Sequence, residues 1–272
     1  MTELLESTYH YHLSKKDEPS KEETLEKLIK TVFKESDETY GYRSVTDALK
    51  VKGHKINPKR VLRIMTKLGI KCVKFSNKKR KYNSYKVKVG KIAPHRLKRR
   101  FDTPIPLQKL VTDVTEFKCL SDQKLYLSPI MDLYNREIIS YKVSKRPTLD
   151  LVMDPLKEAV LIVEEHASFR TTIHSDQGWH YQHNSWVKTL KEHHIFQSMS
   201  RKGNCIDNSP MEILKQEMYY GEDTVSYETL KNKIEAYIHK YNTKQGKEKL
   251  SGLSPVDYRK QDTQLAAQYG IL

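Results

Sequence analysis

The order of secondary-structure patterns after residue 103 constrains the fold of this 272-residue chain more than any other feature. Three runs rich in β-branched and aromatic side chains, at residues 109–118, 124–133 and 136–144, predict strands joined by short turns. Helical and strand patterns then alternate, which is typical of parallel crossovers. This order predicts an α/β domain in which a mixed five-stranded sheet is flanked by helices.

Hydrophobic periodicity locates the elements that follow these three strands. The clearest helix is expected at residues 149–165, where seven apolar residues fall on one helical face. The remaining elements are expected as strands at residues 171–174 and 195–199, a helix at 184–193 between them, and helices from Ser209 and from Tyr227. Helices that alternate with strands can cover both faces of a sheet.

The N-terminal part has a different pattern. Residues 1–20 are polar without a clear period and are expected to form a tail. From Lys21 onward a helical period appears, and a second short helix is expected from Ser44, as its N-cap, to Lys52. This pattern separates residues 21–70 from the strand-rich part of the chain.

The third helix of the N-terminal part is the clearest, because Asn57 can cap it and Pro58 suits its first turn. Its apolar face is expected from Val61, Leu62, Met65 and Leu68, and its outer face carries Lys59, Arg60, Arg63 and Lys67. Three short helices with a basic last helix suit a helix-turn-helix DNA-binding domain at residues 21–70. A small helical bundle whose basic face is merely solvated fits the same pattern.

Residues 71–102 carry a dense run of positive charge. The stretch 71–101 holds thirteen Lys or Arg and no Asp or Glu, in a chain whose formal net charge is +15. Such a run repels itself and suits contact with a phosphate backbone, while Tyr82 and Tyr85 can stack on bases. A solvated linker between two domains is the alternative. The charge balance as a whole predicts a polyanionic partner.

Three carboxylates carry the strongest chemical signal in the chain. Asp113 lies inside the first strand run, Asp176 follows a short strand, and Glu212 lies where a helix begins. A stretch of 35 residues separates Asp176 from Glu212. Carboxylates on two strand ends and one helix can converge on a pair of divalent metal ions, and such a site cuts and joins phosphodiester bonds.

Each of these carboxylates also has an ordinary structural explanation. Asp113 would meet water if its strand lay at the edge of the sheet. Asp176 would form an Asx-type turn at the end of its strand. Glu212 would complete a capping box with Ser209, a role that needs no catalysis. The residues alone leave both interpretations open.

Cysteine and histidine positions argue against a zinc site or a disulfide framework. Cys72, Cys119 and Cys205 are odd in number and far apart in the sequence, which suits a reducing cytosol. His174 and His180 have no zinc-type spacing with them and are expected to be structural or to support other ligands. No apolar run has the length of a membrane span, so no membrane partner is expected.

The combined segments resemble the second-frame transposase of bacterial insertion sequences, which has a D,D(35)E integrase core of the retroviral integrase superfamily. The likeness covers nearly the whole chain, and the motifs are specific in combination although no single one is. It rests on residues 111–117, 125–129, 132–137, 174–179, 181–182, 197–204 and 207–212 in the core, and on residues 40–43, 59–65, 241–242 and 252–255 elsewhere.

The resemblance implies a ribonuclease H-like catalytic domain at residues 103–265, followed by a tail at 266–272. It implies that Asp113, Asp176 and Glu212 are catalytic and bind two Mg²⁺ or Mn²⁺ ions, hard cations that suit oxygen ligands and phosphate substrates. The implied activity is DNA transposition by metal-dependent cleavage and strand transfer at insertion-sequence ends.

DNA is the implied partner, both as the terminal repeats of the insertion sequence and as target DNA. The side chains expected to contact it are Arg43, Lys59, Arg60, Arg63, Lys202 and Lys215. A homo-oligomer on DNA and a protein from an upstream reading frame are further implied partners. The implied location is the bacterial cytoplasm, in association with the nucleoid.

One departure from the family pattern lies directly after Glu212, where roughly one helical turn is missing. The family lysine seven positions after the glutamate is replaced by Lys215, three positions after it. Both spacings fall on roughly the same helix face, so Lys215 is still expected to face DNA. Because a shortened helix can misplace Glu212, the alternative is a catalytically impaired relative that binds ends or represses transposition.

Overall fold

The computed structural model describes residues 21–72, 90–98, 100–201 and 209–268, with the backbone alone at residues 21, 209–212 and 265–268. The chain divides into two compact units, of which the first comprises Met1–Val73 with Gly246–Gly252. The second comprises Lys74–Gln245 with Leu253–Leu272. Several sequence predictions lie outside the described residues: the N-terminal tail, most of the basic run, Lys202, Cys205 and the side chain of Glu212.

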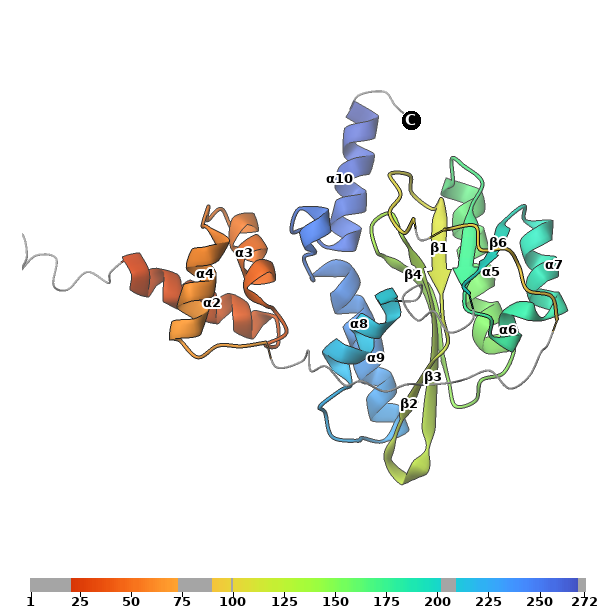
Figure 1. The fold of residues 1–272 in the computed structure, drawn as a ribbon, viewed down its shortest axis with the longest axis horizontal. Helices are drawn as coiled ribbons and strands as arrows, with labels where there is room; N and C mark the ends of the chain where they lie inside the picture. The colour runs from red at the N-terminus through yellow and green to blue at the C-terminus, as the bar shows by residue number, and fades with distance from the viewer. Residues whose placement is uncertain (1–20, 73–89, 99, 202–208, 269–272) are drawn as a thin grey trace, which may run out of the picture. The chain divides into compact units, whose positions relative to one another are not determined.

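Three helices form a small core in the first unit (Figure 1), as the sequence predicts. They are α2 (Lys21–Glu35), α3 (Tyr42–Val51) and α4 (Pro58–Lys67). Ile29, Leu49 and Ile64, one from each helix, are fully buried where the helices meet. The expected cap is confirmed, because the Asn57 side chain accepts a hydrogen bond of 2.9 Å from the Lys59 backbone N–H.

Two details of this unit correct the sequence prediction. Helix α3 begins at Tyr42, and its N-cap is Gly41 rather than Ser44. In α4, Leu62 is 44% exposed and Ile64 is buried in its place. Successive helical residues are about 100° apart, so only one of two neighbours such as Val61 and Leu62 can lie at the centre of the inward face.

Six strands form one mixed sheet in the second unit (Figure 1). They are β1 (Lys109–Thr112), β2 (Thr115–Lys118), β3 (Lys124–Asp132), β4 (Ile138–Ser144), β5 (Thr172–Ser175) and β6 (Phe196–Met199). Strand β3 pairs antiparallel with β1, β2 and β4, whereas β5 pairs parallel with β1 and β6. Among the described residues the order β4-β3-β1-β5-β6 confirms the mixed, ribonuclease H-like sheet.

The first predicted strand is divided at Asp113, which belongs to neither β1 nor β2. Both halves nevertheless pair with β3 in one continuous register, because Thr112 lies opposite Ile130 and Thr115 lies opposite Leu127. The two halves are therefore parts of one strand position, so the described sheet has the five positions that were predicted. The interruption lifts Asp113 out of the regular ladder while keeping its neighbours paired.

Helices cover both faces of this sheet (Figure 1). They are α5 (Asp150–His166), α6 (Trp179–Gln182), α7 (Asn184–Glu192), α8 (Ser209–Met218), α9 (Tyr227–Thr243) and α10 (Pro255–Gln268). A short 3₁₀ helix at Leu120–Asp122 joins β2 to β3, and another at Glu248–Leu250 belongs to the first unit. The sequence does not predict α6. Helix α10 continues to Gln268, so residues 266–268 are helical rather than the expected tail.

Two hydrophobic clusters fill the layers between sheet and helices. On one face, Val111 and Phe117 pack with residues of α8 and α9, among them Leu214. On the opposite face, Leu110 and Ile130 pack with residues of α5, α6 and α7. The inward face predicted for residues 149–165 is confirmed, since its apolar side chains belong to this second cluster.

The end of the predicted basic linker packs against the sheet. Leu97 is buried in the cluster that contains Val111. The backbone N–H of Arg96 donates a 2.9 Å hydrogen bond to Ser198 Oγ of β6. Residues 90–98 therefore belong structurally to the second unit rather than to a solvated connection.

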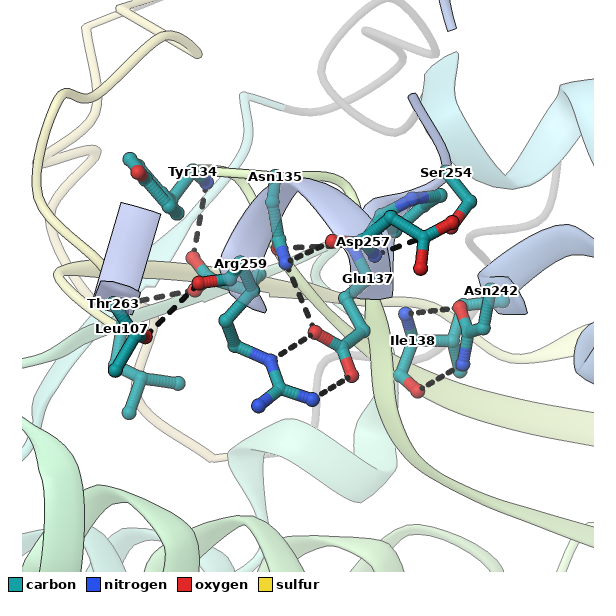
Figure 2. A network of polar contacts seen from close by, with 12 residues as sticks. Leu107, Tyr134, Asn135, Glu137, Ile138, Asn242, Ser254, Asp257, Arg259 and Thr263 are labelled. Carbon is teal, nitrogen blue, oxygen red and sulfur yellow. Dashed lines mark hydrogen bonds and ion pairs between the residues drawn. The ribbon is translucent and has the colours of Figure 1, made fainter. Parts of the chain in front are cut away.

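A polar network fastens α10 to the turn between β3 and β4. Figure 2 shows the Arg259 guanidinium reaching both carboxylate oxygens of Glu137, with Nε 2.7 Å from Oε2 and Nη2 3.0 Å from Oε1. Asn135 Nδ2 donates to Glu137 Oε2 and to the Pro255 carbonyl oxygen. Glu137 is largely buried, so these donors compensate for the water that its carboxylate has lost.

Candidate active site

Two of the three predicted carboxylates leave neighbouring parallel strands at the same level. Val111 of β1 lies opposite His174 of β5 in the parallel ladder. Asp113 and Asp176 each follow these paired residues by two positions, so both emerge at the carboxyl ends of adjacent strands. Ligand sites in open α/β sheets lie beyond the carboxyl ends of the strands, which is where this pair is found.

Tyr181 is a buried side chain that lies near both carboxylates. The Tyr181 side chain is 1% exposed, and its hydroxyl lies 3.4 Å from Thr112 Oγ1. Burial raises the pKa of Tyr181 well above its ordinary value, and the negative charges of Asp113 and Asp176 raise it further. Both carboxylates are therefore close enough to the same phenol to act on it, and both are half-buried themselves.

A tight turn fixes the orientation of Asp176. Its Oδ1 accepts a 2.8 Å hydrogen bond from the backbone N–H of Gly178, so the Asx-type turn expected as an alternative is present. A side chain at position 178 would place its Cβ only 2.9 Å from this oxygen. The turn does not compete with a role in a site, because it holds the carboxylate in one orientation.

Amide side chains brace the loop that follows Asp176. Gln177 Nε2 donates to the Ser200 carbonyl oxygen at 2.9 Å, and Gln182 Nε2 donates to the Gln177 carbonyl oxygen at 2.6 Å. Gln197 Nε2, from β6, donates to the Tyr181 carbonyl oxygen at 2.6 Å. These bonds join the loop, α6 and β6, so the backbone beneath Asp176 is held from several directions.

Helix α8 brings the backbone of Glu212 to the strand that carries Asp113. Leu214, two residues after Glu212, is 4% exposed and packs in the cluster that contains Val111 and Phe117. The Tyr219 ring meets Phe117 edge-on at 5.1 Å between centroids. The helix carrying the third predicted carboxylate therefore packs against the strand position that holds Asp113, and the side chain of Glu212 is outside the described residues.

Lys215 lies between this helix and the sheet. Its Nζ is 5.6 Å from the centroid of the Phe117 ring, and the side chain is half-buried. Phe117 is on the same strand position as Asp113, four residues further along. Lys215 therefore points toward Phe117 of β2, four residues beyond Asp113, and its contact with DNA stays a prediction.

The other predicted DNA-contacting residues, apart from Lys202, lie in the first unit. Lys59 and Arg60 are exposed on α4. Arg63 Nη2 lies 3.3 Å from Glu22 Oε2 of α2, and Arg43 Nε donates to the Tyr42 hydroxyl at 3.2 Å. Exposed ion pairs contribute little stability, so these contacts leave the basic side chains able to exchange partners.

The histidines near the site are held by protein groups. His174 is buried, with Nδ1 2.8 Å from Ser198 Oγ, and burial followed by the charge of His95 lowers its pKa to about 4. His180 Nε2 lies 2.8 Å from the Pro147 carbonyl oxygen, and burial lowers its pKa. Within the described residues no three His, Cys, Asp or Glu side chains gather as a metal-binding group.

The donor chemistry at this end of the sheet fits a hard divalent cation. Asp113 and Asp176 offer carboxylate oxygens from adjacent strands, and helix α8 carries the third carboxylate against the same strand. Mg²⁺ and Mn²⁺ prefer oxygen ligands, and they commonly bind to one or two protein carboxylates together with substrate phosphates. The residues present therefore fit such an ion.

Sequence reasoning did not single out two aromatic residues beside the site. In the sequence, Tyr181 was noted only as part of a segment that resembles the transposase family. A tyrosine five residues after Asp176 could have been used to predict a neighbour of the site. Trp179 is 42% exposed and opens α6. One turn of helix has no detectable period, which explains why both were missed.

Comparisons with protein families cover both units. A family model described as "Integrase core domain" matches residues 103–205, and a second model with the same description matches residues 209–262. A model described as "HTH-like domain" matches residues 20–80. No described helix is long and apolar enough to span a membrane.

Two curated relatives are similar over most of their length. The putative transposase InsK for insertion sequence element IS150 of Escherichia coli is 41% identical over 263 residues, which cover 95% of this chain and 91% of that protein. An uncharacterized transposase-like protein of Haemophilus influenzae is 47% identical over 213 residues, 76% of this chain and 94% of that protein.

Solved structures are more distant. The HTLV-2 integrase catalytic core domain in complex with magnesium is 15% identical, with a TM-score of 0.40, over 57% of this chain and 97% of that one. The catalytic domain of Mos1 mariner transposase gives a TM-score of 0.41 at 12% identity, over 49% of this chain and 70% of that one. Similarity at this level supports no inference about function.

Proposed function

Because this chain belongs to the bacterial insertion-sequence transposases with an integrase core domain and serves DNA transposition, we propose that Asp113, Asp176 and Glu212 form its catalytic centre. The observation that carries the proposal is the shared level of Asp113 and Asp176 on adjacent parallel strands, above one buried phenol. The packing of α8 on the strand position of Asp113 supports Glu212 as the third member.

The three carboxylates would hold two Mg²⁺ or Mn²⁺ ions. When bound, such ions supply activation of the attacking oxygen and stabilisation of the leaving oxygen during phosphodiester displacement. In cleavage, a water oxygen forms a bond to phosphorus while the bond to the 3′ oxygen breaks, and that oxygen takes up a proton. In joining, the freed 3′-hydroxyl forms the new bond to a phosphate of target DNA, whose own 3′ oxygen leaves.

The chain's own residues would position these reactions. The Gly178 N–H holds Asp176 in one orientation. The buried Tyr181 side chain, which lies near both aspartates, would keep that side of the site closed to water. Lys59, Arg60 and Lys215 would bind DNA phosphates, and the whole chain would act as a homo-oligomer that brings two ends together, with or without an upstream-frame partner.

A cleavage and joining assay on DNA that carries the ends of the element tests this proposal. Asp113→Asn and Asp176→Asn should each lower both activities by about 1,000-fold, or about 4 kcal/mol of transition-state stabilisation, with unchanged thermal unfolding. They should also weaken Mn²⁺ binding followed by electron paramagnetic resonance. Asp122→Asn, at an exposed carboxylate in the connection between β2 and β3, is the matched control.

Two outcomes would contradict the assignment. Activity that survives Asp176→Asn would remove this residue from the catalytic centre. A wild-type protein that binds the ends and Mn²⁺ but cuts nothing would favour the impaired end-binding or repressing relative, in which the shortened segment after Glu212 is the defect.

A further inference from the structure

Trp179 is a large aromatic side chain left at the surface beside the candidate active site. It lies three residues after Asp176, at the start of α6, and it is 42% exposed. Single exposed hydrophobic residues are common on protein surfaces, so exposure alone decides nothing. The contacts of the indole ring distinguish this tryptophan from an incidental one.

The indole is held in place by a stacked histidine. The ring centroids of Trp179 and His180 are 3.8 Å apart, with 28° between the ring planes. Adjacent residues of a regular helix do not face each other, so this pairing depends on the four-residue α6. His180 is itself buried and lies 2.8 Å from the Pro147 carbonyl oxygen. The indole therefore stacks on a histidine whose own position is fixed by burial and by its contact with Pro147.

The loop that contacts His180 also contains two cations. Lys145 and Arg146 precede Pro147 in the loop after β4, and both are exposed. Lys145 Nζ lies 4.7 Å from the centroid of the Tyr227 ring, at the start of α9. The loop thus runs between α9 and His180, with Arg146 next to the residue that binds the histidine. Two exposed cations therefore directly precede the residue whose carbonyl oxygen contacts His180, the histidine stacked on Trp179.

A supported aromatic ring beside cations is the arrangement that binds unpaired nucleotides. Single-stranded nucleic acid is bound by aromatic side chains that stack on its bases and by cations that follow its phosphates. A base inside a duplex is already stacked on both faces and offers none to a protein ring. The exposed indole therefore suits an unpaired base rather than continuous duplex DNA.

We propose that Trp179 is a stacking platform for an unpaired base next to the phosphate that enters between Asp113 and Asp176, with Arg146 binding the adjoining backbone. This proposal rests on the proposed function, because the carboxylates define where the phosphate lies. It adds a requirement on the substrate: the base pairs beside the scissile phosphate open before the DNA strand is cut.

The chain contains two tryptophans, which makes the platform directly measurable. Trp186 is 1% exposed, so Trp186→Phe leaves Trp179 as the sole indole and removes the buried background signal. Stacking of a base on Trp179 should quench its fluorescence. With the full-length protein and no divalent metal, we expect strong quenching by end DNA with an unpaired tip and weak quenching by the same DNA as a blunt duplex.

Binding to the unpaired DNA should depend on the aromatic ring at position 179. Trp179→Leu should weaken binding to DNA with the unpaired tip by about 10- to 100-fold and leave binding to blunt duplex unchanged. Trp179→Phe should retain most of the affinity. Phe169→Leu is the matched control, because Phe169 is 58% exposed at the opposite end of β5 and should have no effect on either DNA.

The quenching assay separates this proposal from that of the catalytic centre. Asp176→Asn should abolish cutting and retain quenching, because stacking needs no metal. Equal quenching by blunt and unpaired DNA, or unchanged affinity in Trp179→Leu, would overturn the platform while leaving the carboxylates untouched. Because the fluorescence signal comes from an unaltered Trp179, a folding defect in Trp179→Leu would not prevent the test.

Discussion

The two ends of the β1–β5 strand pair lie beside carboxylates under opposite conditions, with Asp132 of the neighbouring β3 at one end. At the amino ends, Asp132 is 3% exposed and its two oxygens accept the backbone N–H groups of Leu107, at 2.8 Å, and Tyr134, at 3.0 Å. At the carboxyl ends, Asp113 and Asp176 are half-buried and lie beside a loop and an interrupted strand.

This contrast separates stabilising carboxylates from those suited to chemistry. Asp132 and Glu137 are enclosed by protein donors, which offset part of the lost hydration and join the turn after β3 to the surrounding chain. A carboxylate satisfied in this way has little capacity left for a ligand. Asp113 and Asp176 lie where the backbone leaves the sheet, so solvent and substrate can reach them.

The largest effect expected from this comparison is a change of folding stability with pH, caused by Asp132. Burial raises the pKa of Asp132 from 3.8 to about 6, against the lowering effect of the Tyr134 and Leu107 N–H groups. The folded state then binds the proton more tightly than the unfolded state, so stability from this group falls as pH rises from about 4 to about 6. The shift corresponds to a change on the order of 3 kcal/mol.

Thermal unfolding of wild type and Asp132→Asn across this pH range measures the effect. The wild type should be most favoured over the variant near pH 4 and should lose that advantage by pH 7. Asp122→Asn, at an exposed carboxylate, should show a constant difference from wild type. A constant difference for Asp132→Asn as well would show that the amino-end carboxylate is not held in the way its burial indicates.

Loss of the Glu137–Arg259 pair, which lies at the same end of the sheet as Asp132, should have a smaller effect on stability. Arg259→Ala removes two of the donors to a largely buried carboxylate and should destabilise the second unit by about 1–3 kcal/mol. The melting temperature should fall by roughly 5 °C, given about 2–4 °C per kcal/mol for a domain of this size. Cleavage per folded molecule, measured well below the transition, should not change.

Lys260→Ala is the control for this prediction, because Lys260 is the exposed neighbour of Arg259 on α10. Equal melting temperatures for the two variants would mean that the network in Figure 2 contributes nothing measurable. A loss of cleavage with unchanged stability would mean that α10 acts on the catalytic end, and the separation of the two ends would fail.

A change at Gly178 should produce the smallest of these effects, at the catalytic end alone. Gly178→Ala forces Asp176 Oδ1 away from a Cβ that would lie 2.9 Å from it. We expect cleavage to fall about 10-fold, or about 1.4 kcal/mol, because small displacements of a catalytic group are costly. The melting temperature should change little, since Gly178 has an ordinary backbone conformation with φ −57°. Unchanged cleavage would show that the turn does not position Asp176.

The sequence predicts the long elements well, and it singles out two aspartates whose catalytic role stays a prediction. The helix at Asp150–His166 has a clear apolar period, and its inward residues are buried as expected. Asp113 and Asp176 were found because each interrupts or follows an apolar strand run. Their shared level is then a consequence of parallel pairing between β1 and β5.

Features that depend on distant contacts were not predictable. The sequence places Asp132 at the end of a strand. In the fold, its buried carboxylate accepts a hydrogen bond from the N–H of Leu107, which lies 25 positions away in the sequence. The N-cap of α3 was misplaced because Ser44 has a better capping side chain than Gly41, yet the chain enters the helix earlier. The four-residue α6 is too short to have a period, so the exposure of Trp179 emerged only from the structure.

The interruption at Asp113 also limits how this segment can change in length. Two residues lie between β1 and β2, and because side chains alternate along a strand, an even number keeps Val111 and Phe117 on the same face. Insertion or deletion of a single residue would turn the apolar side chains of β2 away from α8 and α9 and would shift Asp113 relative to Asp176. Core packing and the candidate site therefore both require an even number of residues between β1 and β2. This segment can accept substitutions, but a single-residue change in length would disrupt both.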